Sequence, residues 1–483
     1  MRVHLVGVSG TGMGALALLF KEAGDEVGGS DVAFDPPTGP ALRAAGVRCM
    51  VGFDPAHLEP RPDLVVVGNA IRRGNVEDEA AQGLGIERIS MSDALRRRFL
   101  TKRRPLIVAG THGKTTTSAM CAWLLSRASF EPGWFIGGAP KGLSAGASIG
   151  STRIKPGRGR SPFVVEGDEY DAVYWQKHPK FLDYVGVGPD DIAILTSIEH
   201  DHVDIYPDAS AYDAAFRAFL RAVPAGGLVV CAAHDAHVRE VVSEETRARI
   251  AWFALEHEDT GSVTATWLGS PAAFTPDGAQ TFDLFAGGVS CGRFSLRVPG
   301  RHNVRNAVAA IAACAEGFGL RVNEARTHMA GFEGVRRRQD LLGEPRGVRV
   351  YDDFAHHPTA VDETLRALRA RHPNGALWVA FEPRSATACR AVHQDAYARA
   401  FDAADHVLLA PLGRTNIPAG ERLDVERLAH DIGPPASAMS GVDAIVTRIA
   451  RESQAGDTVA LLSNGAFGGI HEKLLAALRR QEP

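Results

Sequence analysis

Apolar residues along the chain follow two alternating patterns, short continuous runs and longer stretches in which they recur at helical spacing. The short runs are rich in Val, Ile and Leu, as in strands that are buried on both faces. Strands that alternate with helices are typical of an α/β fold with largely parallel sheets. The predicted buried strands are Val3–Val8, Leu64–Gly68, Pro105–Gly110, Phe163–Glu166, Ile192–Ser197, Gly227–Ala232, Val348–Asp352, Leu377–Phe381, His406–Ala410 and Thr458–Ser463.

The pattern changes between residues 260 and 298, where short β-rich segments are separated by Gly and Pro turns. These segments are Ser262–Trp267, Gln280–Phe285 and Gly292–Val298. Turn residues at such short intervals favour neighbouring antiparallel strands over crossover helices. We therefore expect a small antiparallel sheet beside the mixed sheet of the central part of the chain.

A chain of 483 residues has room for about three domains of ordinary size. Two breaks in the pattern predict the boundaries, the basic run Arg96–Arg104 and the segment Gly334–Gln339. They give domains at 1–102, 103–335 and 336–483, with Rossmann-like sheets in the first and third. The basic run is interpreted as a solvated linker and helix end, and residues 153–160 as a mobile surface insertion.

The most specific local motif is Gly110-Thr111-His112-Gly113-Lys114-Thr115-Thr116, between a predicted strand and a predicted helix to about Arg127. Backbone N–H groups of such a loop cradle phosphate at the helix N-terminus. Lys114 would reach the β- and γ-phosphates, and the Thr115 hydroxyl would bind Mg²⁺. Val108 stands where the longer form of the motif has glycine, so the match is to a shorter variant. The central domain is thus predicted to be a P-loop ATPase domain.

Two acidic clusters follow predicted strands, Glu166–Asp171 and Glu199–Asp204. In an open α/β sheet, ligands bind beyond the carboxyl ends of the strands, so both clusters should lie near the phosphate loop. Mg²⁺ prefers oxygen ligands of this kind. The sequence therefore predicts a metal site beside the nucleotide.

A second glycine-rich loop, Gly7–Gly14, follows the first strand and opens a helix predicted over Ala15–Ala23. Asp31 stands where dinucleotide-binding proteins place the acid that contacts ribose, although Ser9 replaces the second glycine of that fingerprint. The loop indicates a diphosphate or nucleotide ligand. An NAD-dependent dehydrogenase remains an alternative, but it leaves Lys114 and Thr115 without a role.

The composition argues against several classes of function. The net charge of −4 argues against a protein that coats nucleic acid or an anionic membrane. The chain has no apolar run long enough for a membrane span. Its six cysteines form no CxxC pair, so neither a cysteine zinc site nor a disulfide framework is predicted. We expect a cytoplasmic protein without membrane insertion.

Motifs along the whole chain resemble the Mur ligase family, the ATP-dependent amino-acid and peptide ligases of peptidoglycan precursor assembly. The resemblance rests on the phosphate loop and on segments that occur in the same order as in that family. These segments are Glu166–Glu169, Ile198–His202, Gly300–Asn306, Arg336–Arg338 and Asp352–Pro358. Phe354 stands where the family usually has tyrosine, so any hydrogen bond made by that hydroxyl is absent here.

Within the family, five segments resemble the branch that joins UDP-N-acetylmuramate to the tripeptide L-alanyl-γ-D-glutamyl-meso-diaminopimelate in peptidoglycan recycling. They are Gly68–Asn75, Glu169–Asp171, Lys180–Phe181, Glu382–Ser385 and Ser463–His471. The alternative is the branch that adds L-alanine. Either branch implies ATP, Mg²⁺ and an acyl-phosphate intermediate, with roles in cell wall biogenesis, cell shape and cell division. We expect a monomer or weak homodimer.

The resemblance also implies roles for residues around the nucleotide. Lys114, His202 and Arg338 would be catalytic, and Thr115, Glu166 and His202 would bind Mg²⁺. An imidazole is a borderline ligand for Mg²⁺. The alternative role for Asn303, and to a lesser degree for Asn306, is that of a helix cap. The residues implied to bind ATP are Gly110, Thr111, Gly113, Lys114, Thr115, Thr116, His302, Asn303, Asn306 and either Asp352 or Asp353.

The substrate-binding residues that the resemblance implies fall into two groups. His112 would face the muramyl sugar, and His356, Arg384 and Asn464 would contact the carboxylates or the amine of the peptide. The UDP moiety would lie against the N-terminal domain, held by Ser9, Gly10, Thr11, Gly12, Met13, Ser30, Asp31 and Asn69.

Overall fold

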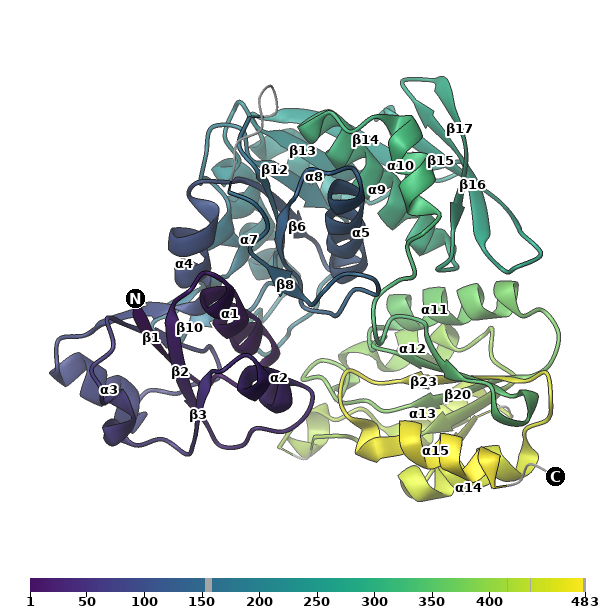
Figure 1. Ribbon diagram of the computed structural model, residues 1–483. Helices are drawn as coiled ribbons and strands as arrows, with labels where there is room; N and C mark the ends of the chain where they lie inside the picture. Colours follow the sequence, from purple (N-terminus) through teal and green to yellow (C-terminus); the bar gives the residue numbers. More distant parts are fainter. Residues whose placement is uncertain (153–158, 415, 435, 481–483) are drawn as a thin grey trace.

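The computed structural model describes residues 1–152, 159–414, 416–434 and 436–480. It consists of three α/β units, shown in purple at the N-terminus, in blue to green in the centre and in green to yellow at the C-terminus (Figure 1). The predicted fold class is confirmed. Most of the insertion predicted at 153–160 lies outside the described residues.

The N-terminal unit is a five-stranded parallel sheet in the order β3-β2-β1-β4-β5, which is one half of a Rossmann arrangement. Its first helix begins at Thr11 and not at the predicted Ala15, so part of the glycine-rich loop is already helical. The elements are β1 (Arg2–Val6), α1 (Thr11–Glu22), β2 (Glu26–Asp31), α2 (Thr38–Ala44), β3 (Arg48–Val51), β4 (Leu64–Val67), α3 (Val76–Gly83), β5 (Glu87–Ser90) and α4 (Met91–Leu95).

The central unit contains one ten-stranded mixed sheet in the order β17-β16-β15-β14-β13-β12-β6-β9-β7-β8. The chain enters this sheet at β6, in its interior. It then adds β7, β8 and β9 on one side and β12 to β17 on the other. The loop after β6 therefore lies at the topological switch point of the sheet. The elements are β6 (Arg104–Ala109), α5 (Lys114–Arg127), β7 (Gly133–Phe135), β8 (Ala147–Ser148), β9 (Pro162–Glu166), β10 (Asp171–Val173), β11 (Gln176–Pro179), α6 (Phe181–Tyr184), β12 (Ile192–Leu195), α7 (Ala209–Ala222), β13 (Leu228–Ala232), α8 (Ala236–Glu245), β14 (Arg249–Leu255), β15 (Trp267–Phe274), β16 (Gln280–Ala286), β17 (Val289–Leu296), α9 (Arg301–Phe318) and α10 (Val322–Met329).

The antiparallel strands β15, β16 and β17 continue this central sheet, because β15 pairs in parallel with β14 and antiparallel with β16. The strand predicted at Ser262–Trp267 is wrong. Gly261 has a φ of 57°, and the chain turns there, so the strand starts only at Trp267.

The C-terminal unit has a six-stranded sheet in the order β18-β19-β23-β20-β21-β22, parallel except for β18. It has the Rossmann-like character predicted for this part of the chain. The elements are β18 (Asp340–Gly343), β19 (Arg349–Asp353), α11 (Pro358–Arg371), β20 (Leu377–Phe381), α12 (Gln394–Ala400), β21 (His406–Leu409), α13 (Val425–Ile432), β22 (Ala436–Ala438), α14 (Val442–Glu452), β23 (Thr458–Leu462) and α15 (Ile470–Arg479).

The hydrophobic cores show how the three units are joined. One core cluster contains residues of both the N-terminal and the central unit, among them Phe20, Phe99 and Phe163. The C-terminal unit packs two clusters of its own on the two faces of its sheet, around Trp378 and Tyr397. The first two units thus share apolar packing, and the polar groups described below lie at the joint with the third.

The basic run before β6 is a helix end, as predicted, but it is not a solvated linker. Arg98 pairs with the buried Asp25, with Nη2 3.0 Å from Oδ2. Arg96 donates to the carbonyls of Asp183 and Val185. Arg103 is only 3% exposed. Arg96 thus binds the first unit to the second, whereas Arg98 pairs within the first unit.

Among the described helices, none combines the length and the apolar character needed to cross a membrane. All six cysteines are free thiols.

Candidate functional site

A cavity of about 500 Å³ lies between the central and C-terminal units. That volume suits a nucleotide-sized ligand. It is lined by the phosphate loop, by the loops after β9 and β12, by the start of α9 and by the segments around β19. The predicted site residues that line it are Thr111, His112, Gly113, Lys114, Thr115, Thr116, Glu166, His202, His302, Asn303, Asn306, Arg338, Asp353, His356 and Asn464.

The phosphate loop joins the carboxyl end of β6 to the N-terminus of α5, which begins at Lys114. Gly113 precedes the helix with a φ of 79°, a left-handed conformation that an L side chain rarely adopts. A Cβ atom at this position would collide with the side-chain amide of Asn306 on α9. The loop therefore needs glycine both for its turn and for the close approach of α9.

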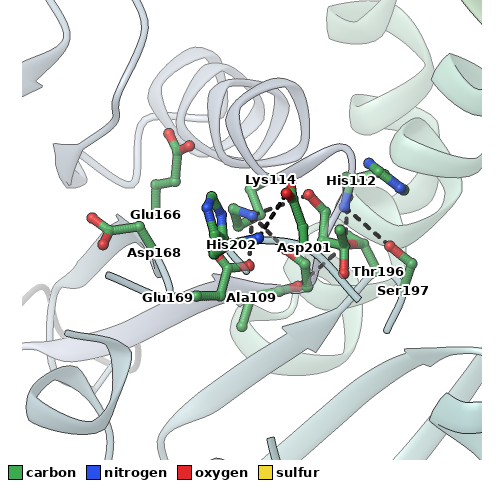
Figure 2. Close-up of polar contacts among 12 residues, drawn as sticks. Ala109, His112, Lys114, Glu166, Asp168, Glu169, Thr196, Ser197, Asp201 and His202 are labelled. Atoms are coloured by element: carbon green, nitrogen blue, oxygen red, sulfur yellow. Dashed lines mark hydrogen bonds and ion pairs between the residues drawn. The ribbon is translucent and has the colours of Figure 1, made fainter. Parts of the chain in front are cut away.

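Lys114 is held by a buried carboxylate. Its Nζ lies 2.7 Å from Glu169 Oε1 and donates to the carbonyls of Gly110 at 2.5 Å and Thr111 at 3.1 Å (Figure 2). Glu169 is 1% exposed. The sequence placed Glu169 in an acidic cluster but assigned it no role. The signal that could have found it is its position three residues after Glu166, in the loop that follows β9.

Thr115 and Glu166 form an oxygen-rich corner beside Lys114. The Thr115 hydroxyl donates to Glu166 Oε1 at 2.7 Å, and Gly137 N donates to Oε2 at 2.7 Å. Arg338 from the C-terminal unit reaches the same hydroxyl, with Nη2 3.4 Å from Oγ1. A hydroxyl and a carboxylate with room for water are the ligands that Mg²⁺ prefers, so these residues fit the predicted metal.

His202 lies on the other side of Lys114, with Nε2 3.7 Å from Glu169 Oε2 and its ring against Tyr170. Its φ of 54° is left-handed and turns the loop after β12 back toward the cavity. The adjacent Asp201 is buried. Burial would raise the pKa of this carboxyl, but the neighbouring His202 and His356 outweigh that effect and lower it strongly. Asp201 is thus a fixed negative charge at the joint between the units.

The start of α9 presents His302, Asn303 and Asn306 to the cavity. The helix-cap interpretation of the two asparagines is wrong, because the N-cap is Gly300 and no side chain caps the helix. Asn303 Nδ2 donates to Pro299 O at 2.7 Å, and Asn306 Nδ2 donates to Asn303 Oδ1 at 3.3 Å. The side-chain oxygen of Asn306 points to the phosphate loop, because a Cβ atom at Gly113 would collide with Asn306 Oδ1.

Of the two aspartates at the end of β19, Asp353 faces the cavity. It accepts hydrogen bonds from Gln339 N and Ala355 N, both at 2.7 Å. Burial raises the pKa of Asp353 to about 6, although Arg338 and these two N–H groups oppose the shift. Asp352 instead faces Arg337 and His471, at 3.3 Å and 3.1 Å.

The C-terminal unit supplies further groups at the joint. The guanidinium of Arg338 stacks 4.9 Å from the centre of the Phe354 ring, so the ring orients Arg338 without a hydroxyl. His356 Nδ1 donates to Phe354 O at 3.0 Å, which leaves Nε2 as the acceptor nitrogen, 3.9 Å from Asp201 Oδ2. Arg384 does not line the cavity. Its side chain is 44% exposed and lies against Gly465.

The residues predicted to bind UDP lie in the N-terminal unit, apart from the cavity. None of the described residues that line the cavity comes from this unit. Asp31 Oδ2 accepts from Ser9 N at 2.8 Å, so the predicted ribose acid supports the glycine loop. Ser30 is fully buried and donates its hydroxyl to Glu77, and the Met13 side chain is in the core. The side chains of Ser30 and Met13 are therefore not available to a ligand. Exposed positions at this edge are Gly10, Thr11 and Asn69.

Three family models match the chain in the order of its three sheets. They are the Mur ligase family catalytic domain at residues 2–103, the Mur ligase middle domain at 163–314 and the Mur ligase glutamate ligase domain at 337–465. A relative from Escherichia coli (strain K12) is 36% identical and covers 100% of this chain and 99% of its own length.

The chain belongs to the Mur ligase family.

As a family member it is an ATP-dependent ligase, and the dehydrogenase alternative is thereby excluded. The E. coli relative is named UDP-N-acetylmuramate–L-alanyl-γ-D-glutamyl-meso-2,6-diaminoheptandioate ligase. A relative from Roseiflexus sp. (strain RS-1), named UDP-N-acetylmuramate–L-alanine ligase, is 34% identical, with 100% of both chains covered. The crystal structure of a murein peptide ligase from Psychrobacter arcticus 273-4 is 32% identical, with a TM-score of 0.73 and 100% of both chains covered. The ligase thus resembles both branches in sequence.

Proposed function

We propose that this ligase joins UDP-N-acetylmuramate to the tripeptide L-alanyl-γ-D-glutamyl-meso-diaminopimelate in cytoplasmic peptidoglycan recycling, through an acyl phosphate. One observation carries the proposal. Groups suited to a triphosphate, Lys114, Thr115, Glu166 and Arg338, line one cavity together with two groups suited to a peptide substrate, His356 and Asn464. The names of the E. coli and Psychrobacter arcticus relatives support this choice.

The first step is phosphoryl transfer to the substrate carboxylate. An oxygen of the lactyl carboxylate attacks the terminal phosphorus of ATP, the bond from that phosphorus to the bridging oxygen breaks, and ADP leaves. Lys114 and Arg338 lie at the two ends of the Thr115 corner and neutralise the charge of the transferring group. Thr115 and Glu166 would hold Mg²⁺, with His202 nearby for a second ion, and Mg²⁺ supplies further neutralisation of phosphate charge.

The second step forms the amide bond. The free amine of the peptide attacks the acyl carbon, a tetrahedral intermediate collapses, and inorganic phosphate leaves with both electrons of the broken C–O bond. The amine must lose a proton in this step. His356 would accept it, because this residue lines the cavity and its Nδ1–H is bound to Phe354 O, which leaves Nε2 as the accepting nitrogen. The protein otherwise acts by holding the reactants in line.

ATP binding divides between two units. His302, Asn303 and Asn306 would contact adenine, since amide groups match its N6 and N7 edge. Asp353, rather than Asp352, would bind the ribose because it is the aspartate that faces the cavity. The UDP moiety would lie at the backbone of the N-terminal glycine loop, near Thr11 and Asn69. The proposed domains 1–102, 103–335 and 336–483 then bind UDP-sugar, ATP and peptide.

The choice of tripeptide over L-alanine rests on two segments that meet in the C-terminal unit. Ser463 Oγ donates to Glu382 Oε2 at 2.5 Å, so the motifs Glu382–Ser385 and Ser463–His471 form one surface at adjacent strand ends. Arg384 lies on that surface, and its nearest carboxylate, Glu382, is 3.9 Å away. A tripeptide carries several carboxylates for such a guanidinium, whereas L-alanine carries one.

The proposed function is tested by phosphate release. The purified ligase is incubated with ATP, Mg²⁺ and UDP-N-acetylmuramate, with either the tripeptide or L-alanine as the amine. We expect release that depends on the tripeptide and is at least tenfold slower with L-alanine at equal concentration. Turnover with L-alanine alone would refute the tripeptide assignment and favour the alanine branch. Lys114→Ala is the control that should lose turnover with either amine.

A further inference from the structure

Three side chains at the joint between the central and C-terminal units converge on one point. They are His112 in the phosphate loop, Glu199 after β12 and His357 at the start of α11, and one donor atom from each lies within 4.8 Å of the other two. His112 Nε2 is 2.7 Å from Glu199 Oε2, and His357 Nδ1 is 3.8 Å from the same oxygen. The two imidazole rings are tilted against each other with centres 4.8 Å apart. The proposed ligation chemistry gives this trio no joint role.

His357 is the strongest indication that a ligand belongs here. Its side chain is 4% exposed, yet neither ring nitrogen forms a hydrogen bond with any residue in the described part of the chain. A buried imidazole without a partner costs free energy, so such a group calls for an explanation. Burial, and the neighbouring His112 after it, lower the pKa of His357 to about 3. The ring is therefore neutral and has a lone pair available for a cation.

We propose that His112, Glu199 and His357 bind a divalent transition-metal ion such as Zn²⁺. Two imidazole nitrogens, one carboxylate oxygen and an open fourth position form a donor set that zinc favours and that Mg²⁺, which prefers oxygen, does not. Ligand atoms in a tetrahedral zinc site stand about 3.4 Å apart. The observed 2.7 Å and 3.8 Å separations lie on either side of that value. Binding of the ion replaces the hydrogen bond between His112 Nε2 and Glu199.

The backbone and neighbouring side chains hold the three donors in place. Glu199 Oε1 accepts from Thr359 Oγ1 at 2.8 Å, which turns the other oxygen toward the two imidazoles. His112 N donates to Ser197 Oγ at 3.0 Å (Figure 2). Two donors belong to the central unit and one to the C-terminal unit. The bound ion is thus a cross-link across the cavity.

Zinc binding by the full-length ligase tests the proposal. The protein is freed of metal by chelation, and Zn²⁺ is titrated in competition with a chromophoric chelator, with Mg²⁺ in the buffer. We expect one equivalent of zinc to bind, and His357→Gln to weaken that binding about tenfold or more. Glu199→Gln, which keeps a group able to bond Thr359, should weaken it as well. Co²⁺ in place of zinc should give the visible absorption of a four- or five-coordinate ion in the wild type.

His393→Gln is the matched control. This histidine packs edge-to-face against His357 with ring centres 4.6 Å apart but is not one of the three donors. It should bind zinc like the wild type. The proposal is overturned if the wild type binds no zinc in the presence of Mg²⁺, if His357→Gln binds as tightly as the wild type, or if His393→Gln loses the same equivalent. None of these results depends on ligation, so they leave the proposed function separately testable.

Discussion

Removing the carboxylate that holds Lys114 should destabilise the free ligase and make its stability depend on nucleotide. Glu169 is 1% exposed, and Lys114 is 13% exposed beside it. In Glu169→Gln the ammonium of Lys114 keeps its two carbonyl partners but loses its only charged partner among the described residues. A phosphate group that binds at the loop supplies the missing negative charge. The variant should therefore gain more from an ATP analogue than the wild type does.

The magnitude follows from the burial of the pair. Breaking a buried ion pair by removing one partner costs about 3–5 kcal/mol, because the other charge is left uncompensated. The carbonyl oxygens of Gly110 and Thr111 remain, so we expect the lower end, about 3 kcal/mol. At roughly 2–4 °C per kcal/mol for a domain of this size, Tm falls by about 6–12 °C.

The assay is thermal unfolding with and without a non-hydrolysable ATP analogue and Mg²⁺. Asp168→Asn is the matched control, since Asp168 is 33% exposed and pairs with a different lysine, Lys180, at 3.0 Å. It should lose less stability, and the analogue should shift its Tm by the wild-type amount. The reasoning is refuted if Glu169→Gln melts within about 2 °C of the wild type, or if the analogue stabilises both proteins equally.

Three further predictions concern the same cavity. Asp353 has a raised pKa of about 6, so its ionisation opposes folding, and the stability it contributes at low pH is lost as pH rises from about 4 through 6. Asp353→Asn should lack this loss. In denaturant titrations, the free energy of unfolding of the wild type should therefore fall relative to that of the variant by up to about 3 kcal/mol over this pH range. A free energy of unfolding that changes with pH in the same way in both proteins would contradict the burial of the charge. Thr115→Val should raise the Mg²⁺ concentration for half-maximal turnover by about tenfold, whereas Thr117→Val, at a buried hydroxyl without a described hydrogen-bond partner, should leave it unchanged; equal effects would remove Thr115 from the metal site. Gly113→Ala combines strain of about 1–2 kcal/mol with a clash against Asn306, so it should abolish most turnover in the coupled ADP assay while circular dichroism shows a folded chain; full activity would contradict the close approach of α9.

The phosphate loop could be predicted from the sequence because its chemistry is local. A buried strand, Gly110 to Thr115 and a helix follow one another, and the spacing alone fixes the turn and the hydroxyl. The acidic corner at Glu166 followed from the rule that strand ends meet at one edge of a parallel sheet. The antiparallel extension was recognised, but its first strand was placed too early because the pattern did not show the turn at Gly261.

Other parts of the site depend on packing between segments far apart in the chain. Successive side chains at a strand end point to opposite faces, so the choice between Asp352 and Asp353 needed the position of the cavity. The partner of Lys114 could not be assigned because Glu169 acts through a loop whose course depends on the fold. The same holds for Arg96, whose hydrogen bonds to carbonyl groups of the central unit cannot be recognised in a run of basic residues.

The fate of oxygen atoms tests the central claim most directly. UDP-N-acetylmuramate labelled with ¹⁸O in its lactyl carboxylate is incubated with the ligase, ATP, Mg²⁺ and the tripeptide, and the product phosphate and nucleotide are analysed by mass spectrometry. An acyl phosphate requires that one labelled oxygen leave with phosphorus, so we predict singly labelled phosphate together with UDP-N-acetylmuramoyl-tripeptide. Unlabelled phosphate, or label in phosphate without the tripeptide adduct, would contradict the account.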